Sequence, residues 1–399
     1  MARSAFALAA SVALLALAQF PAVARQDDKD DPEVDGKKVS VWIDTIVKDE
    51  SARKRALAVE ALAKAWTEKR HEQALFYIGR ALRVDTSAAV RSQAALAIGG
   101  IRELEIRYLI EKKENLGVKD LVDSMGTEKE SRVRKEIARA IGRFPMVAKM
   151  AVVQLTGALK DPEPATRAAV AEALSVTGSD GKSAAAGLAP LLEDEDKAVK
   201  RAAVIALGRI TPEGSATIAD TMAKMLASEK DADMKVELVT SIGLLGEKSP
   251  AVVAALAVLL TDPEDELRRR AVRTLGTFGT AAAPAIEPLY KAASTDKLKD
   301  IRVDAIHGFG SALGPAGVKS RVKDLLALLG DTEYEVRLAV VEEIGSLGND
   351  LLDDPATIKA LRVRLSDSHL KVREAVKIAL AKIEKKPDPK KDPEPKPAP

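Results

Sequence analysis

An acidic side chain is followed six residues later by a basic one at ten places along this 399-residue chain. Successive basic members lie 33 to 43 positions apart. A repeat of this period is typical of stacked units that each pack only on their neighbours, so the sequence predicts a solenoid. The ten pairs are Asp49/Arg55, Asp85/Arg91, Glu128/Arg134, Asp161/Arg167, Asp194/Lys200, Glu229/Lys235, Asp262/Arg268, Asp296/Arg302, Asp331/Arg337 and Asp367/Arg373.

Each repeat carries the pattern of two helices. In one unit, residues 183–193 predict a first helix, 194–196 a turn and 197–210 a second helix. Apolar residues in that second helix recur at helical spacing and predict one buried stripe. A glycine or small residue stands at one register near each second-helix end, where it favours a turn and close packing. These residues are Ala63, Gly99, Gly142, Ser175, Gly208, Gly243, Gly276, Gly310, Gly345 and Ala381.

The acid of each pair precedes the second helix, where a carboxylate can cap free N–H groups at the positive helix end. Asp161-Pro162-Glu163 and Asp262-Pro263-Glu264 predict an N-cap acid with proline at the first helical position. The base lies within the helix, beside the buried stripe. We expect it to bridge carboxylates of its own and adjacent units.

The residue before each base is apolar in eight of the ten units; Lys54 and Thr166 depart from this pattern. An acid followed five and six positions later by an apolar residue and a base resembles HEAT repeats, in the short bacterial form related to bilin-lyase repeats. The resemblance implies an all-α, armadillo-like right-handed superhelix of about ten two-helix repeats. It also implies an acid–base ladder and a concave face lined by second helices.

Two features depart from a uniform HEAT-like array. The interval between Arg91 and Arg134 is 43 residues and predicts a lengthened helix or loop. A tetratricopeptide array has a similar period, but its pattern is suggested only once, around Trp66 and Tyr77. The acid–base pair recurs in every unit and favours the HEAT-like alternative.

The chain ends differ from the array. Residues 1–24 resemble a secretory signal peptide, with Arg3, an apolar stretch and a small-residue cleavage site near Ala24. Export to a periplasmic or extracellular location is therefore expected, without stable membrane insertion after cleavage. We expect a flexible acidic linker over 25–37, the array over 38–384 and a disordered Pro/Lys/Glu-rich tail over 385–399.

Composition limits the chemistry. The chain has no cysteine, a net charge of +2 and only 3% aromatic residues. These features exclude thiol chemistry and disfavour nucleic-acid binding. The three histidines lack metal-site spacing, and no nucleophile motif is present, so we expect no cofactor, no metal and no enzymatic activity. If the chain were catalytic, His307 would be the first candidate.

Positions one, five and nine after each ladder base are expected to face away from the buried stripe and line the concave surface. Mixed arginine and aliphatic residues there predict a scaffold that binds another protein or peptide. The candidate binding residues are Lys135, Arg139, Arg143, Arg201, Arg209, Arg269, Arg273 and His307. The alternatives are an enzyme or enzyme accessory of the bilin-lyase-like group, and nucleic-acid binding by the basic patches.

Overall fold

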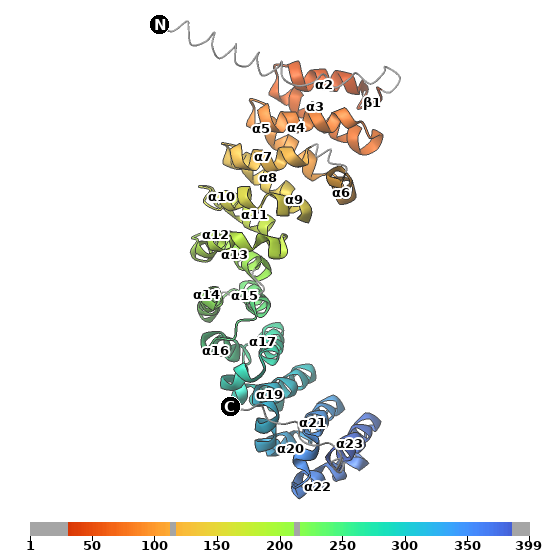
Figure 1. Ribbon diagram of the computed structural model, residues 1–399, viewed down its shortest axis with the longest axis vertical. Helices are drawn as coiled ribbons and strands as arrows, with labels where there is room; N and C mark the ends of the chain where they lie inside the picture. The colour runs from red at the N-terminus through yellow and green to blue at the C-terminus, as the bar shows by residue number, and fades with distance from the viewer. Residues whose placement is uncertain (1–30, 112–116, 211–215, 385–399) are drawn as a thin grey trace, which may run out of the picture. The chain divides into compact units, whose positions relative to one another are not determined.

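The computed structural model describes residues 31–111, 117–210 and 216–384; the expected signal peptide and tail lie outside these ranges. The described residues form 22 α-helices, several short 3₁₀ segments and one two-stranded hairpin (Figure 1). The chain divides into two compact units, residues 1–124 (unit 1) and 125–399 (unit 2), and each is considered by itself. The fold is an all-α solenoid, as the sequence predicts.

A short hairpin precedes the first helix. Strands β1 (Glu33–Val34) and β2 (Lys37–Lys38) pair antiparallel around a turn in which Asp35 and Gly36 have positive φ. Val34 is buried, and its carbonyl accepts a hydrogen bond of 2.8 Å from the Trp42 indole. The expectation of a flexible linker over 25–37 is therefore wrong for residues 31–37, because this apolar anchor fixes an otherwise charged segment.

Unit 1 consists of paired helices with one extra helix. Its helices are α2 (Val39–Lys48), α3 (Ala52–Lys69), α4 (Glu72–Val84), α5 (Ala88–Gly99), α6 (Glu103–Glu111) and the start of α7 (Val118–Thr127). The long interval between Arg91 and Arg134 contains both α6 and α7, where most repeats have a single first helix. The predicted lengthening is thus an inserted helix.

Unit 2 alternates first and second helices. The second helices are α8 (Ser131–Gly142), α11 (Pro164–Ser175), α13 (Lys197–Ile210), α15 (Ala232–Leu245), α17 (Asp265–Thr277), α19 (Lys299–Ser320), α21 (Tyr334–Ser346) and α23 (Leu370–Ile383). The first helices include α9 (Pro145–Met150), α10 (Val152–Ala158), α12 (Ala185–Leu188), α14 (Ala216–Ser228), α16 (Pro250–Leu259), α18 (Ile286–Thr295), α20 (Val322–Leu328) and α22 (Pro355–Val363). Figure 1 shows α14 beside α15 and α16 beside α17.

Several first helices are broken. The segment predicted as one helix over 183–193 is instead η2 (Gly178–Ala184), α12 and η3 (Ala189–Glu193). Pro190 lies at the start of η3, where it cannot donate to a continuing α-helix. The second helix, Lys197–Ile210, has the predicted bounds.

Small residues at the shared register bring second helices of adjacent repeats together. A Cβ built on Gly208 would lie 2.8 Å from Ser241 Cα, and one on Gly142 would lie 3.0 Å from Ala173 Cα. The prediction that these residues end their helices is wrong for several units, since α13 and α15 continue past Gly208 and Gly243. At Gly208 and Gly142 the role is close approach, because a side chain would meet the neighbouring backbone, whereas a Cβ on Gly243 would meet only the Thr274 side chain, at 3.4 Å.

The turns out of second helices use other glycines. Gly178, Gly246, Gly279, Gly314 and Gly348 all have positive φ, a conformation that costs other residues free energy. Gly314 makes a kink inside α19, so the helical run after it belongs to the following repeat. None of the described helices is long and apolar enough to span a membrane.

Candidate partner-binding face and the ladder beside it

The acid of each pair lies at the turn before a second helix. Its carboxylate accepts a hydrogen bond from the N–H two residues later, as in Glu163 to Asp161 (3.0 Å) and Glu333 to Asp331 (2.8 Å). The helix itself begins one residue further on, so Glu163 and Glu264 are the N-cap residues. The prediction of Asp161 and Asp262 as N-caps is wrong, because these carboxylates accept hydrogen bonds from Glu163 and Glu264 within the turn that precedes the helix.

The base connects two turns. In eight units, arginine Nη1 donates to the backbone carbonyl of its own repeat's acid, at 2.7–3.0 Å. The rest of the guanidinium faces the acid of the next repeat. Among the described residues, the bases that form that ion pair include those of Arg55–Asp85, Arg134–Asp161, Arg167–Asp194, Lys235–Asp262, Arg268–Asp296, Arg302–Asp331 and Arg337–Asp367. The carboxylate contact therefore runs between adjacent units.

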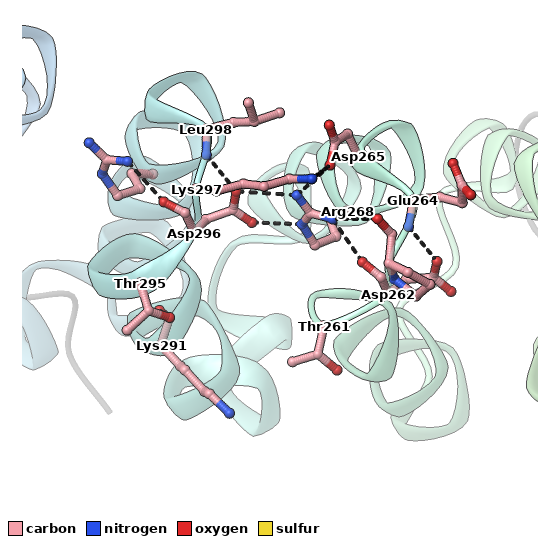
Figure 2. Close-up of polar contacts among 12 residues, drawn as sticks. Thr261, Asp262, Glu264, Asp265, Arg268, Lys291, Thr295, Asp296, Lys297 and Leu298 are labelled. Carbon is pink, nitrogen blue, oxygen red and sulfur yellow. Dashed lines mark hydrogen bonds and ion pairs between the residues drawn. The ribbon is translucent and has the colours of Figure 1, made fainter.

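Figure 2 shows one rung of this ladder. Arg268 Nη1 donates to the Asp262 carbonyl at 2.8 Å, while Arg268 Nε donates to Asp296 at 2.7 Å. Asp265, one helical turn before Arg268, accepts a further bond of 2.7 Å from Nη2. The planar guanidinium supplies donors in several directions at once, which a lysine ammonium on a single stem does less well.

The ladder has irregular members. Lys235 makes a single contact of 2.9 Å with Asp262. Lys200 and Arg373 have no carboxylate partner among the described residues. Arg373 belongs to the last repeat of the described chain and keeps only its bonds to backbone carbonyls. The first acid, Asp49, is paired with Lys54 of its own unit at 3.2 Å.

The buried contacts stabilise the charged form of the ladder acids. Hydrogen bonding from Arg167 lowers the pKa of Asp194, and hydrogen bonding from Arg337 lowers the pKa of Asp367, in both cases against the effect of burial. Breaking one partner of a desolvated pair leaves an uncompensated charge and costs about 3–5 kcal/mol. The ladder is thus a structural element that holds repeats in register.

We define the second-helix face of unit 2 as the surface formed by exposed side chains of α8, α11, α13, α15, α17, α19, α21 and α23. The structure places seven of the eight candidate binding residues within these helices, on α8, α13, α17 and α19, and Arg143 is the C-cap residue of α8. Arg139, Arg143, Arg201, Arg209, Arg273 and His307 are exposed, whereas Lys135 and Arg269 are half-buried. Their assignment to a partner stays a prediction.

Several of these bases form a second row of contacts between adjacent repeats. Arg201 pairs with Glu237 at 2.9 Å, and Arg273 pairs with Asp304 at 2.7 Å. Sequence reasoning missed both acids because it considered each second helix separately. Glu237 and Asp304 share a register, two residues after their ladder base, and that shared position was the available signal.

His307 belongs to the same row. Its Nδ1 lies 2.8 Å from Glu343 of the next repeat, and this hydrogen bond raises the pKa of His307. Glu343 occupies a register that holds alanine, glycine, serine or threonine in the other units, and Gly310 leaves room for its carboxylate. The pair joins α19 to α21, and no hydroxyl nucleophile contacts His307 among the described residues.

A surface groove lies between α15 and α17. It encloses about 340 Å³ and is lined by Val239, Thr240, Gly243, Leu244, Glu266, Arg269, Arg270, Arg273 and Thr274. Two of the candidate residues, Arg269 and Arg273, therefore share one depression. Sequence reasoning missed Arg270, whose Nη1 donates to Thr240 across the groove at 2.9 Å.

Within the described ranges, no three His, Asp or Glu side chains are close enough together to hold a metal ion. The groove and the second-helix face instead offer arginine donors, exposed aliphatic groups and a few carboxylates. These groups are suited to hydrogen bonds, ion pairs and apolar contacts.

Comparison with known proteins identifies one family. The sequence model for HEAT repeats matches residues 118–208, 154–243, 219–310 and 322–394, which together cover more than half of the chain. No curated protein matches the sequence. One solved structure contains a similar chain, with 18% sequence identity to this one and a TM-score of 0.46. That structure describes how Kap95p binding induces the switch loops of RanGDP to adopt the GTP-bound conformation. The similarity covers 86% of this chain and 51% of that one, so this chain spans about half of its length.

Proposed function

This chain belongs to the HEAT-repeat family, and from that premise we propose that it is a non-catalytic scaffold that binds another protein or peptide on its second-helix face. Solenoids of this kind present extended surfaces assembled from successive repeats. The proposal concerns the face of unit 2 that carries Arg139, Arg201, Arg273 and His307.

One observation carries the proposal. The ladder arginines that form ion pairs are at most 17% accessible, whereas three other bases on the second-helix face remain exposed: the side chains of Arg139, Arg201 and Arg273 are 56%, 50% and 60% accessible. Leu244 and Ile378 add exposed aliphatic surface on second helices of the same unit. Arginine and aliphatic groups together are the composition expected of a protein interface.

We further propose that the protein is exported. The support is the leader-like composition of residues 1–24, with a charged start, an apolar stretch and a small-residue cleavage site. Measuring the N-terminal residue of the mature protein tests this: an N-terminus at Arg25 supports export with cleavage near Ala24, and a retained Met1 contradicts it.

The other functions receive less support from the geometry. Catalysis would need a nucleophile and base in a water-excluded site, and His307 is half-exposed and bound to Glu343. Nucleic-acid binding would need a strongly basic footprint, but Arg201 and Arg273 are each paired with a carboxylate. Binding of a protein or peptide uses the same side chains without either requirement.

Site-specific crosslinking in the native compartment tests the binding proposal. A photo-crosslinking amino acid would replace Arg139, Arg201 or Arg273 on second helices, and Lys224, Lys291 or Lys359 on first helices as controls. We expect a shared partner to crosslink from the second-helix positions and not from the controls. Crosslinks confined to the first helices would overturn the proposed face.

A further inference from the structure

The groove between α15 and α17 departs from the repeat pattern at the positions that line it. One, two and five residues after the ladder base, α17 carries Arg269, Arg270 and Arg273. The neighbouring second helices carry Val236, Glu237 and Thr240, or Val303, Asp304 and His307. A feature found in every unit serves stacking; three arginines found in one unit are not required by stacking.

The charge of the groove is unbalanced. Its lining contains three arginines and one carboxylate, Glu266. A second carboxylate, Asp304 of the next repeat, pairs with Arg273. The excess positive charge favours an anionic group in the groove, and guanidinium matches carboxylate geometry through paired donors.

Two guanidinium donors in the groove also lack acceptors. The Nε atoms of Arg269 and Arg270 are buried without a hydrogen-bond partner. The Glu266 carboxylate lies 4.0 Å from Arg269 Nε and 2.8 Å from Arg270 Nε. The shorter of these contacts is an ion pair by distance, but its geometry is not that of a hydrogen bond. Buried donors without acceptors cost free energy, which an added acceptor recovers.

An apolar side chain can complete the contact. Leu244 at the groove edge is 49% exposed, although it lies on a helix whose other leucines are buried. Gly243 beside it leaves space, since a Cβ built there would meet only Thr274, at 3.4 Å. The groove therefore combines cationic donors with an uncovered aliphatic surface.

From these contacts we infer that the groove between α15 and α17 binds an acidic, extended segment of a partner protein. Carboxylates of the segment contact Arg269, Arg270 and Arg273, and an aliphatic side chain packs on Leu244. This inference rests on the proposed function and specifies the chemistry of the partner. The occupant is a peptide segment because the groove pairs charge with an exposed apolar side chain.

Fluorescence anisotropy of the full chain tests the inference. The probe is a labelled peptide of about 12 residues repeating Ser-Glu-Glu-Leu, at about 50 mM salt, where ionic contacts are weakly screened. Its matched control replaces every Glu with Gln, and a single-stranded DNA of similar length tests the nucleic-acid alternative. We expect the acidic peptide to bind, the glutamine peptide to bind at least roughly tenfold more weakly, and binding to weaken as salt rises.

Matched pairs of variants test whether the acidic peptide binds in the groove between α15 and α17. The double variant Arg269→Gln/Arg273→Gln is compared with Lys224→Gln/Lys291→Gln, which removes the same charge from first helices. Leu244→Ser is compared with Val258→Ser, which lies exposed on a first helix. We expect the groove variants to lose binding by roughly tenfold and the controls to keep it, with circular dichroism showing that each variant is folded.

Three results would overturn the inference: no binding of the acidic peptide to the folded chain, equal binding by the groove and control variants, or tighter groove-dependent binding of the DNA. Failure here leaves the proposed function separately testable. A partner that crosslinks from Arg139 and Arg201 while the acidic peptide does not bind would support the scaffold and contradict this groove chemistry.

Discussion

Arg337 and Asp367 belong to consecutive repeats and are joined by two parallel hydrogen bonds of 2.8 Å each. Their side chains are only 8% and 2% exposed. Arg337 also donates to the carbonyls of Asp331 and Thr332 in its own repeat, so one guanidinium fixes two successive turns. The same arrangement recurs at Arg167 and Arg302.

Removing a ladder arginine is expected to destabilise unit 2 more when that arginine contacts a buried carboxylate than when it contacts only backbone carbonyls. Arg337→Gln should lower the free energy of unfolding by about 3–5 kcal/mol, because Asp367 becomes a buried unpaired charge. Arg373→Gln should cost only about 1–2 kcal/mol, since Arg373 makes the equivalent carbonyl bonds without a carboxylate partner among the described residues. Urea unfolding measures both values, and equal losses would contradict the account.

Two glycines at the same register should respond in opposite directions to alanine. Gly208→Ala places a Cβ 2.8 Å from Ser241 Cα and should destabilise by about 1–3 kcal/mol. In Gly243→Ala the nearest contact, Thr274, is 3.4 Å away. That variant should stabilise by about 0.5–1 kcal/mol through helix propensity. Thermal unfolding distinguishes them; a shift of the same sign in both variants would refute the packing argument.

Acid should weaken the ladder. The pKa of Asp194 and of Asp367 is lowered in the folded chain, first by hydrogen bonding from Arg167 and Arg337. Their stabilisation is present above the unfolded pKa of about 3.9 and is lost as pH falls through the lower folded pKa. When unfolding is measured between pH 7 and pH 2, the urea concentration at the midpoint should decrease once the pH drops below about 4. Asp367→Asn should flatten this fall, and an unchanged pH profile in that variant would argue against the pair.

The His307–Glu343 contact should have the opposite pH dependence. Hydrogen bonding to Glu343 raises the pKa of His307, so its contribution is fully present below the unfolded pKa of about 6.5 and is lost as pH rises through the folded value. The half-exposed pair should contribute up to about 1 kcal/mol. NMR titration of the His307 ring gives the pKa directly, and Glu343→Gln should lower it; no change would contradict the contact.

The repeat period allowed the fold class and the ladder residues to be predicted, because one spacing recurred ten times. The direction of the pairing was less accessible. Six residues along the chain bring Arg268 only to the Asp262 carbonyl, while the carboxylate contact is to Asp296. Which carboxylate an arginine contacts depends on how adjacent repeats stack, and this is not visible in the spacing within one repeat.

Other features could not be predicted because they depend on contacts between helices. The hairpin needs Trp42 to hold Val34, and Arg270 gains its role only when α15 places Thr240 opposite it. The broken first helix over 178–193 contains glycine and proline whose effect on helix continuity depends on packing. Local pattern therefore predicted the second helices better than the first.

A double-mutant cycle on Arg337 and Asp367 tests most directly whether guanidinium–carboxylate contacts hold the repeats in register. Arg337→Met, Asp367→Asn and the double variant would be compared with the parent chain by urea unfolding. The account predicts a favourable coupling free energy of about 1.5–3 kcal/mol, as for a charge-assisted hydrogen-bonded pair. Additive losses, with no coupling between the two positions, would contradict it.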